Sequence, residues 1–189
     1  MQKFSYFPSY VYRGEEPEWL PQLSIVEGDW DNPQSPSLVH SKEFVNDSRF
    51  FNFKKHLEQI AYAILEEDGY GVESYNIKVT NIWGQRLLFP RYNQLHVHGN
   101  TVFSGFYILD AVGQCAYPVF NDPRPGKLMG DLPAPIFEDV RPPTQYIHFN
   151  NIIPGSLFVF NSWMPHQFVN GAPESEVKFL HFVIAAEKK

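Results

Sequence analysis

The sequence has little cysteine, no excess of basic charge and no long apolar run, and each shortage excludes a class of protein. The single cysteine, Cys115, rules out an internal disulfide, so we expect a reducing, cytoplasmic environment. Lys and Arg number 15 against 21 for Asp and Glu, and the resulting net charge of −6 argues against nucleic acid as a partner. No apolar run approaches the roughly 18 residues of a membrane span, and the first residues lack the apolar core of a signal peptide.

The composition that is present indicates a packed globular protein. Hydrophobic residues make up 43% of the 189 positions and aromatic residues 16%. A chain of this length can bury a substantial core, so residues 1–189 are expected to form a single domain.

One helix and several short strands are expected along the chain. Apolar residues recur at the helical period between Phe53 and Leu65, and Gly69 stands where a left-handed residue would end that helix. The alternating or apolar runs expected to be strands cover residues 4–13, 75–83, 101–109, 115–120, 144–150, 156–160 and 177–185, with one short strand near 23–26. This pattern predicts a mostly β fold, a double-stranded β-helix of the cupin-like jelly-roll type with one main flanking α-helix.

Three histidines form the strongest chemical signal. His96 and His98 stand two apart in an alternating run, so both imidazoles are expected on one face of a strand. His166 follows the short apolar strand 156–160, which begins after the turn residues Pro154 and Gly155. Three imidazoles on one face suit iron(II), zinc or copper, although His96 and His98 would also fit ordinary strand positions.

Several motifs, taken together, resemble one family. They are Leu95-His96-Val97-His98, Ser104-Gly105-Phe106-Tyr107, Asp122-Pro123-Arg124, and the run from Pro154-Gly155 to His166. This set is similar to the prolyl-hydroxylase-like, iron(II)- and 2-oxoglutarate-dependent oxygenases found in phages and marine bacteria. The resemblance implies that His96, His98 and His166 hold Fe(II), that 2-oxoglutarate chelates the metal and that O2 takes the remaining position. It also implies hydroxylation of a substrate while 2-oxoglutarate is decarboxylated to succinate.

The ligand set departs from the family pattern at His98, where most members have Asp or Glu. A three-histidine, cupin-type metalloenzyme that uses no 2-oxoglutarate therefore stays open. Alternatively, His98 is not a ligand and Asp110 or Asp122 completes the triad, although Asp122 before Pro123 is also a typical turn residue.

In this family an arginine on the last strand usually pairs with the far carboxylate of 2-oxoglutarate. This chain has no arginine on that strand. Lys178 is the first candidate for this cosubstrate-binding role and Arg124 the second, whereas Tyr107 could donate its hydroxyl to 2-oxoglutarate. His148 and His181 are interpreted as hydrogen-bonded barrel residues.

The substrate itself is not specified by the sequence. We expect a small molecule or a peptide, selected by the Pro-rich loop 125–145, with neither nucleic acid nor membrane as a partner, and a homodimer is compatible with the chain. A non-catalytic jelly-roll binding module is the alternative from another class. A structural zinc site is disfavoured because such sites are usually four-coordinate and rich in thiolates.

Overall fold

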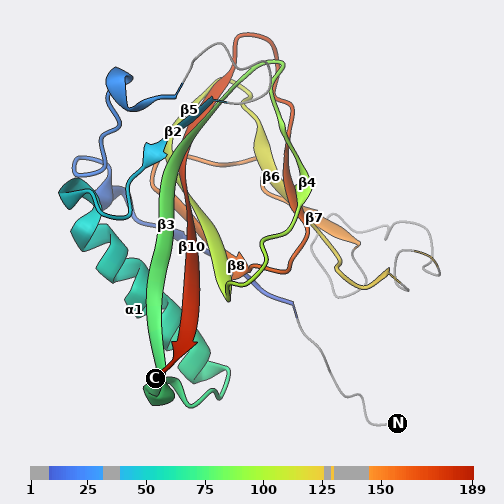
Figure 1. The fold of residues 1–189 in the computed structure, drawn as a ribbon. Coiled ribbons are helices and arrows are strands. Elements are labelled where there is room, and N and C mark those ends of the chain that lie inside the picture. The colour runs from blue at the N-terminus through green and yellow to red at the C-terminus, as the bar shows by residue number, and fades with distance from the viewer. Residues whose placement is uncertain (1–8, 32–38, 126–128, 130–144) are drawn as a thin grey trace.

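The computed structural model describes residues 9–31, 39–125, 129 and 145–189, and all structural statements concern these residues. Two antiparallel sheets face each other, and one long helix lies along the outside of the larger sheet (Figure 1). The longer elements are β1 (Val11–Glu15), β2 (Val39–Glu43), α1 (Phe51–Glu67), β3 (Tyr75–Leu88), β4 (Asn93–His96), β5 (Phe103–Val112), β6 (Tyr117–Asn121), β7 (Tyr146–His148), β8 (Ser156–Asn161), β9 (His166–Val169) and β10 (Glu176–Lys188). Short 3-10 helices cover Pro17–Trp19, Glu27–Asp29, Ser48–Phe50 and Val72–Ser74.

The sheet topology confirms the predicted jelly roll. The larger sheet has the order β1-β8-β5-β10-β3-β2, and the smaller has the order β4-β9-β6-β7. From β4 onward the chain crosses repeatedly between the two sheets, which is the connectivity of a double-stranded β-helix. As a result, the segment between β4 and β5 and the segment between β8 and β9 lie at the same end of the barrel.

Helix α1 forms where the apolar period predicted it. Its buried residues are Phe53, Leu57, Ala61, Ile64 and Leu65, which lie on one face and pack on the larger sheet. Asp47 accepts a hydrogen bond from the backbone N–H of Arg49 just before the helix. Gly69 follows the helix with φ of +87°, a conformation that favours glycine.

The larger sheet separates two apolar clusters. On the helix side, Phe53 meets Tyr107 and Phe182, with ring centroids 5.1 and 6.4 Å from its own. Between the sheets, Phe168 stacks on Phe179 at 4.4 Å, beside Phe106. Alternate residues of β5 and β10 therefore serve opposite faces, as strand geometry requires.

The N-terminal third differs from the sequence prediction. No strand forms at residues 23–26, whereas β2 forms at Val39–Glu43, where the sequence analysis expected no strand. Polar side chains hold β2 at the sheet edge, because Gly84 N–H donates to Ser41 Oγ (2.7 Å) and Ile82 N–H donates to Glu43 Oε1 (2.6 Å). Hydropathy alone does not reveal such a strand. The first strand begins at Val11, and the expected start at residues 4–8 lies outside the described residues.

Within the described residues, no helix has the length and apolar character needed to span a membrane.

Candidate metal centre

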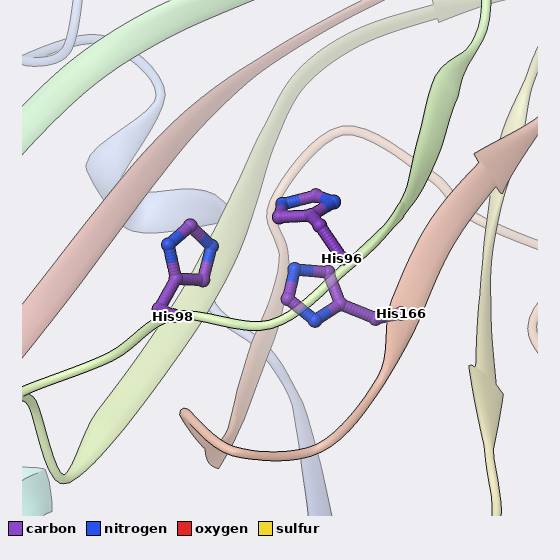
Figure 2. Close-up of side chains that lie close together, drawn as sticks. All are labelled: His96, His98 and His166. Atoms are coloured by element: carbon purple, nitrogen blue, oxygen red, sulfur yellow. The ribbon is translucent and has the colours of Figure 1, made fainter.

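His96, His98 and His166 come together between the two sheets. Each offers one ring nitrogen, and these three nitrogens lie within 4.8 Å of one another. Figure 2 shows that His96 and His98 belong to one segment and that His166 approaches from a second strand. The predicted grouping of the three side chains is therefore present in the fold.

Two sets of contacts place the histidines. His96 ends β4 and His166 begins β9, and the two residues are paired across these antiparallel strands. His98 lies beyond the end of β4, so strand alternation does not position it as the sequence suggested. Instead, its backbone N–H donates to the carbonyl of Ser162 at 2.9 Å. The Ser162 hydroxyl is held in turn by Thr101, at 2.8 Å.

Backbone carbonyls fix the tautomers of two imidazoles. His96 Nδ1 lies 2.7 Å from the carbonyl oxygen of Gln94, and His166 Nδ1 lies 2.9 Å from that of Met164. Because a carbonyl oxygen only accepts, Nδ1 carries the proton in both rings and Nε2 keeps a free lone pair. Such outer hydrogen bonds are typical of metal-binding histidines.

The Nε2 atoms of His98 and His166 are buried and have no hydrogen-bond partner in the described part of the chain. Burial, with smaller effects from the neighbouring His96 and His98, lowers the pKa of His166 to about 3, although the hydrogen bond to Met164 acts in the opposite direction. Burial, followed by the charge of His96, lowers the pKa of His98 to about 4. Both rings are therefore neutral at physiological pH, which is the form that binds a metal ion.

The donor set fits Fe(II). Three neutral nitrogen ligands suit iron, zinc or copper better than magnesium or calcium, and three protein ligands leave coordination positions for other molecules. The buried, unpartnered Nε2 atoms are satisfied if an ion lies between them.

Neither candidate carboxylate joins the three histidines in the described part of the chain. Asp110 faces Lys178, with Oδ2 3.7 Å from Nζ. Asp122 accepts from Arg124, whose Nε lies 2.9 Å from Oδ1. The geometry therefore favours His98 over Asp110 and Asp122 as the third ligand.

The three predicted cosubstrate residues lie elsewhere. Tyr107 packs on the helix side of the sheet, and its hydroxyl donates to the carbonyl of Glu16 at 2.8 Å. Lys178 forms an ion pair with Glu176 at 3.3 Å, and its strand neighbours Val177 and Phe179 are buried between the sheets, so Lys178 points to the other side. Arg124 is held by the adjacent Asp122. Among the described residues these three side chains have other partners and do not contact the histidine triad, so their binding roles stay predictions.

His181 lies beside the three clustered histidines, although the sequence analysis interpreted it as a barrel residue outside the site. It is 1% exposed on β10, and its ring centroid lies 4.7 Å from that of His98 and 4.3 Å from that of Trp83. Neither ring nitrogen has a hydrogen-bond partner among the described residues, contrary to the hydrogen-bonded barrel residue that we expected. The sequence contained one indication of this position. His181 stands two residues after Phe179, so both side chains point to the same face of the strand. His148, by contrast, is exposed on β7.

Comparisons with solved structures support the fold. The chain is 12% identical to a prolyl-4-hydroxylase from Pseudomonas putida, covering 95% of this chain and 93% of that one with a TM-score of 0.59. It is 16% identical to AviO1 from Streptomyces viridochromogenes (94% and 90% covered, TM-score 0.60). It is 9% identical to HygX from Streptomyces hygroscopicus, solved with nickel and 2-oxoglutarate bound (94% and 83% covered, TM-score 0.59).

The family assignment comes from the sequence. A comparison with curated proteins gave no match. A family model described as "Putative 2OG-Fe(II) oxygenase" matches residues 81–176, just over half of the chain. The matched segment contains all three clustered histidines. The chain therefore belongs to this family of 2-oxoglutarate- and Fe(II)-dependent oxygenases, enzymes that use Fe(II), 2-oxoglutarate and O2.

Proposed function

We propose that this oxygenase hydroxylates a C–H bond of its substrate. One oxygen atom of O2 becomes the hydroxyl group, and the other enters the succinate formed with CO2 from 2-oxoglutarate. The observation that carries the proposal is the cluster of three histidines, each with a ring nitrogen within 4.8 Å of the others, inside a chain of this family.

In this proposal His96, His98 and His166 hold Fe(II). When bound, the ion supplies the positions at which 2-oxoglutarate and oxygen react. The protein keeps two of the ligands preorganised, because the carbonyls of Gln94 and Met164 fix the ring orientations of His96 and His166 before any ion binds. An imidazole at position 98 leaves the site one unit more positive than a carboxylate would, which favours binding of dianionic 2-oxoglutarate.

Aromatic side chains shield the site from water. Phe160 and Phe106 contact His166, with ring centroids 4.6 and 5.6 Å from its own. Trp83 lies behind His181 on the same side of the barrel. These rings offer few hydrogen-bonding groups, so they restrict side reactions of a strong oxidant with solvent.

The substrate is proposed to be a small molecule or a peptide. A cavity of about 320 Å³ is lined by Thr101, Asn161 and Trp163 together with residues at and after the end of α1, such as Leu65 and Tyr70, and by none of the three histidines, so it does not mark the substrate site. Among the fold neighbours, HygX was solved with hygromycin B and SnoN with nogalamycin RO, both small molecules.

The proposal is tested by anaerobic addition of Fe(II) and then 2-oxoglutarate to the metal-free protein. We expect a weak visible charge-transfer band that saturates with both ligands and is missing in His166→Ala. Iron binding without a band would favour the three-histidine metalloenzyme that uses no 2-oxoglutarate, an alternative supported by the imidazole at position 98. No iron binding would refute the proposed site.

The single-domain organisation, the cytoplasmic location, the homodimer and the phage or marine-bacterial type stay predictions. Substrate selection by residues 125–145 also stays a prediction, and most of that loop lies outside the described residues.

A further inference from the structure

The cavity of about 320 Å³ at the C-terminal end of α1 has no part in the proposed oxygenase chemistry. None of the three clustered histidines lines it. It adjoins the metal centre only through the turn after β8, which carries Trp163 in its lining and also Ser162, whose carbonyl accepts from the His98 N–H. Its volume is at the lower end of ligand pockets, so it suits one small organic group.

Three large aromatic side chains line this cavity and remain exposed to solvent. They are Tyr70, Tyr75 and Trp163, which are 61%, 37% and 48% exposed. They come from three separate segments, namely the loop after α1, the start of β3 and the turn after β8. The face of an aromatic ring is electronegative and attracts cations, most strongly in tryptophan, and several rings around one cavity are a common means of binding alkylammonium groups.

Asp68 is the one charged side chain that lines the cavity in the described part of the chain. It is exposed, and it forms no ion pair with another described residue. It also caps the C-terminal end of α1, where the helix dipole is negative and the last turn contains no basic residue. Burial, and then the charges of Asp68 and Glu67, raise the pKa of Tyr12, which indicates a negative field at this end of the helix.

The lysines at the end of β10 do not supply a positive charge inside the cavity. Lys189 Nζ donates to the carbonyl of Glu73 at 2.6 Å. Lys188 stands opposite Tyr75 in the register of β10 and β3, but it is exposed and does not line the cavity. A positively charged ligand therefore complements both the aromatic rings and the Asp68 carboxylate.

We propose that this cavity binds an alkylammonium group, with the rings of Tyr70, Tyr75 and Trp163 as its contacts and Asp68 as its counter-charge. A free quaternary ammonium compound and a lysine side chain of a peptide both present this chemistry. A neutral group of the same shape would gain the apolar contacts of the rings but no attraction to the carboxylate. The proposal involves neither Fe(II) nor 2-oxoglutarate, so it is independent of the proposed function.

The experiment compares choline with 3,3-dimethylbutan-1-ol, a neutral molecule of the same shape in which carbon replaces the charged nitrogen. Each is titrated into the full chain, loaded with Fe(II) under anaerobic conditions, by isothermal titration calorimetry. We expect saturable choline binding, at least about tenfold tighter than that of the neutral molecule and weaker at higher salt concentration. A titration with N-acetyl-lysine methylamide separates the two sources, because tighter binding than choline indicates a peptide and weaker binding a free quaternary ammonium compound.

Variants place the binding in this cavity. Trp163→Leu and Asp68→Asn should each weaken choline binding about threefold or more, whereas Asp68→Asn should leave the affinity for the neutral molecule within about twofold of wild type. Tyr70→Leu, at a more exposed ring, replaces Trp163→Leu if that variant does not fold. Tyr62→Leu, at an exposed tyrosine of α1 that does not line the cavity, should leave choline binding unchanged.

Four results would overturn the proposal. They are the absence of saturable choline binding, equal affinities for choline and the neutral molecule, unchanged choline binding in both the ring and the Asp68→Asn variants, and loss of choline binding in His166→Ala. The last result would move the binding to the metal centre. None of them bears on the proposed function, which the charge-transfer band tests separately.

Discussion

Mild acid should destabilise the metal-free protein through its buried histidines. His166 is fully buried, and burial lowers its pKa from 6.5 to about 3, whereas an unfolded chain restores the ordinary value. Burial also lowers the pKa of His181 well below 6.5. Because the folded pKa is the lower one, stability is fully present above pH 6.5 and is lost as the pH falls from 6.5 toward the folded pKa.

The size of the effect follows from the two pKa values of His166. At pH 5 about thirty unfolded imidazoles are protonated for each neutral one, whereas the folded ring is still neutral, so His166 lowers the free energy of unfolding by about 2 kcal/mol. His181 acts in the same direction because burial lowers its pKa well below 6.5, and so does His98, whose pKa burial lowers to about 4. Carboxylates with lowered pKa values, such as Asp29, lose their contribution mainly at lower pH, so the window from pH 6.5 to 5 reports on the histidines.

The assay is urea unfolding of the metal-free protein in a chelator at pH 7, 6 and 5. We expect the free energy of unfolding to fall by at least about 2 kcal/mol between pH 7 and 5 in wild type, and by less in His181→Phe. His148→Phe should keep the wild-type dependence because His148 is exposed. A decline below about 1 kcal/mol in wild type, or an equal decline in His181→Phe, would refute the argument that these rings are buried and neutral.

Three further predictions concern single positions. His166→Ala should weaken Fe(II) binding at least about a hundredfold, measured by competition with a chelator, while circular dichroism retains the wild-type spectrum; unchanged affinity would exclude it as a ligand. Arg49→Ala should lower the free energy of unfolding by about 2 kcal/mol, because it removes 2.8 and 3.2 Å contacts to the buried Asp29; a urea midpoint equal to wild type would contradict this. Gly155→Ala should destabilise the protein by about 1–3 kcal/mol, because φ at this position is +89° and a Cβ would lie 2.8 Å from Pro17 Cα. A thermal unfolding midpoint equal to that of wild type would contradict this prediction.

The sequence predicted the parts of the fold that rest on apolar periodicity. Helix α1 and strands β3, β5, β8 and β10 appear where periodicity placed them, with shifted ends. Strand β2 was missed because side-chain bonds from Ser41 and Glu43 hold it, and β9 was missed because it has only four residues. Both depend on partners far along the chain, which a local pattern does not contain.

The same limit explains which residues of the site could be predicted from the sequence. His96, His98 and His166 were found because two lie close in sequence and the third follows a clear turn and strand. To predict which other residues lie near these histidines, one must know which face of each strand points into the barrel. Alternation shows that Lys178 and Phe179 point to opposite sides, but not which side is the barrel interior. A register shift between these two residues, where β10 pairs with β5, obscures the pattern further.

The face of β10 also decides how the site works. Because Phe179 and His181 point inward, the interior of this strand offers an imidazole near the triad, and Lys178 remains outside in an ion pair. His98 and His166 are neutral at physiological pH, so the positive charge of a loaded site would come mainly from the metal ion itself. An anionic cosubstrate should therefore bind much more weakly to the metal-free protein than to the Fe(II) form, and its affinity should follow metal occupancy.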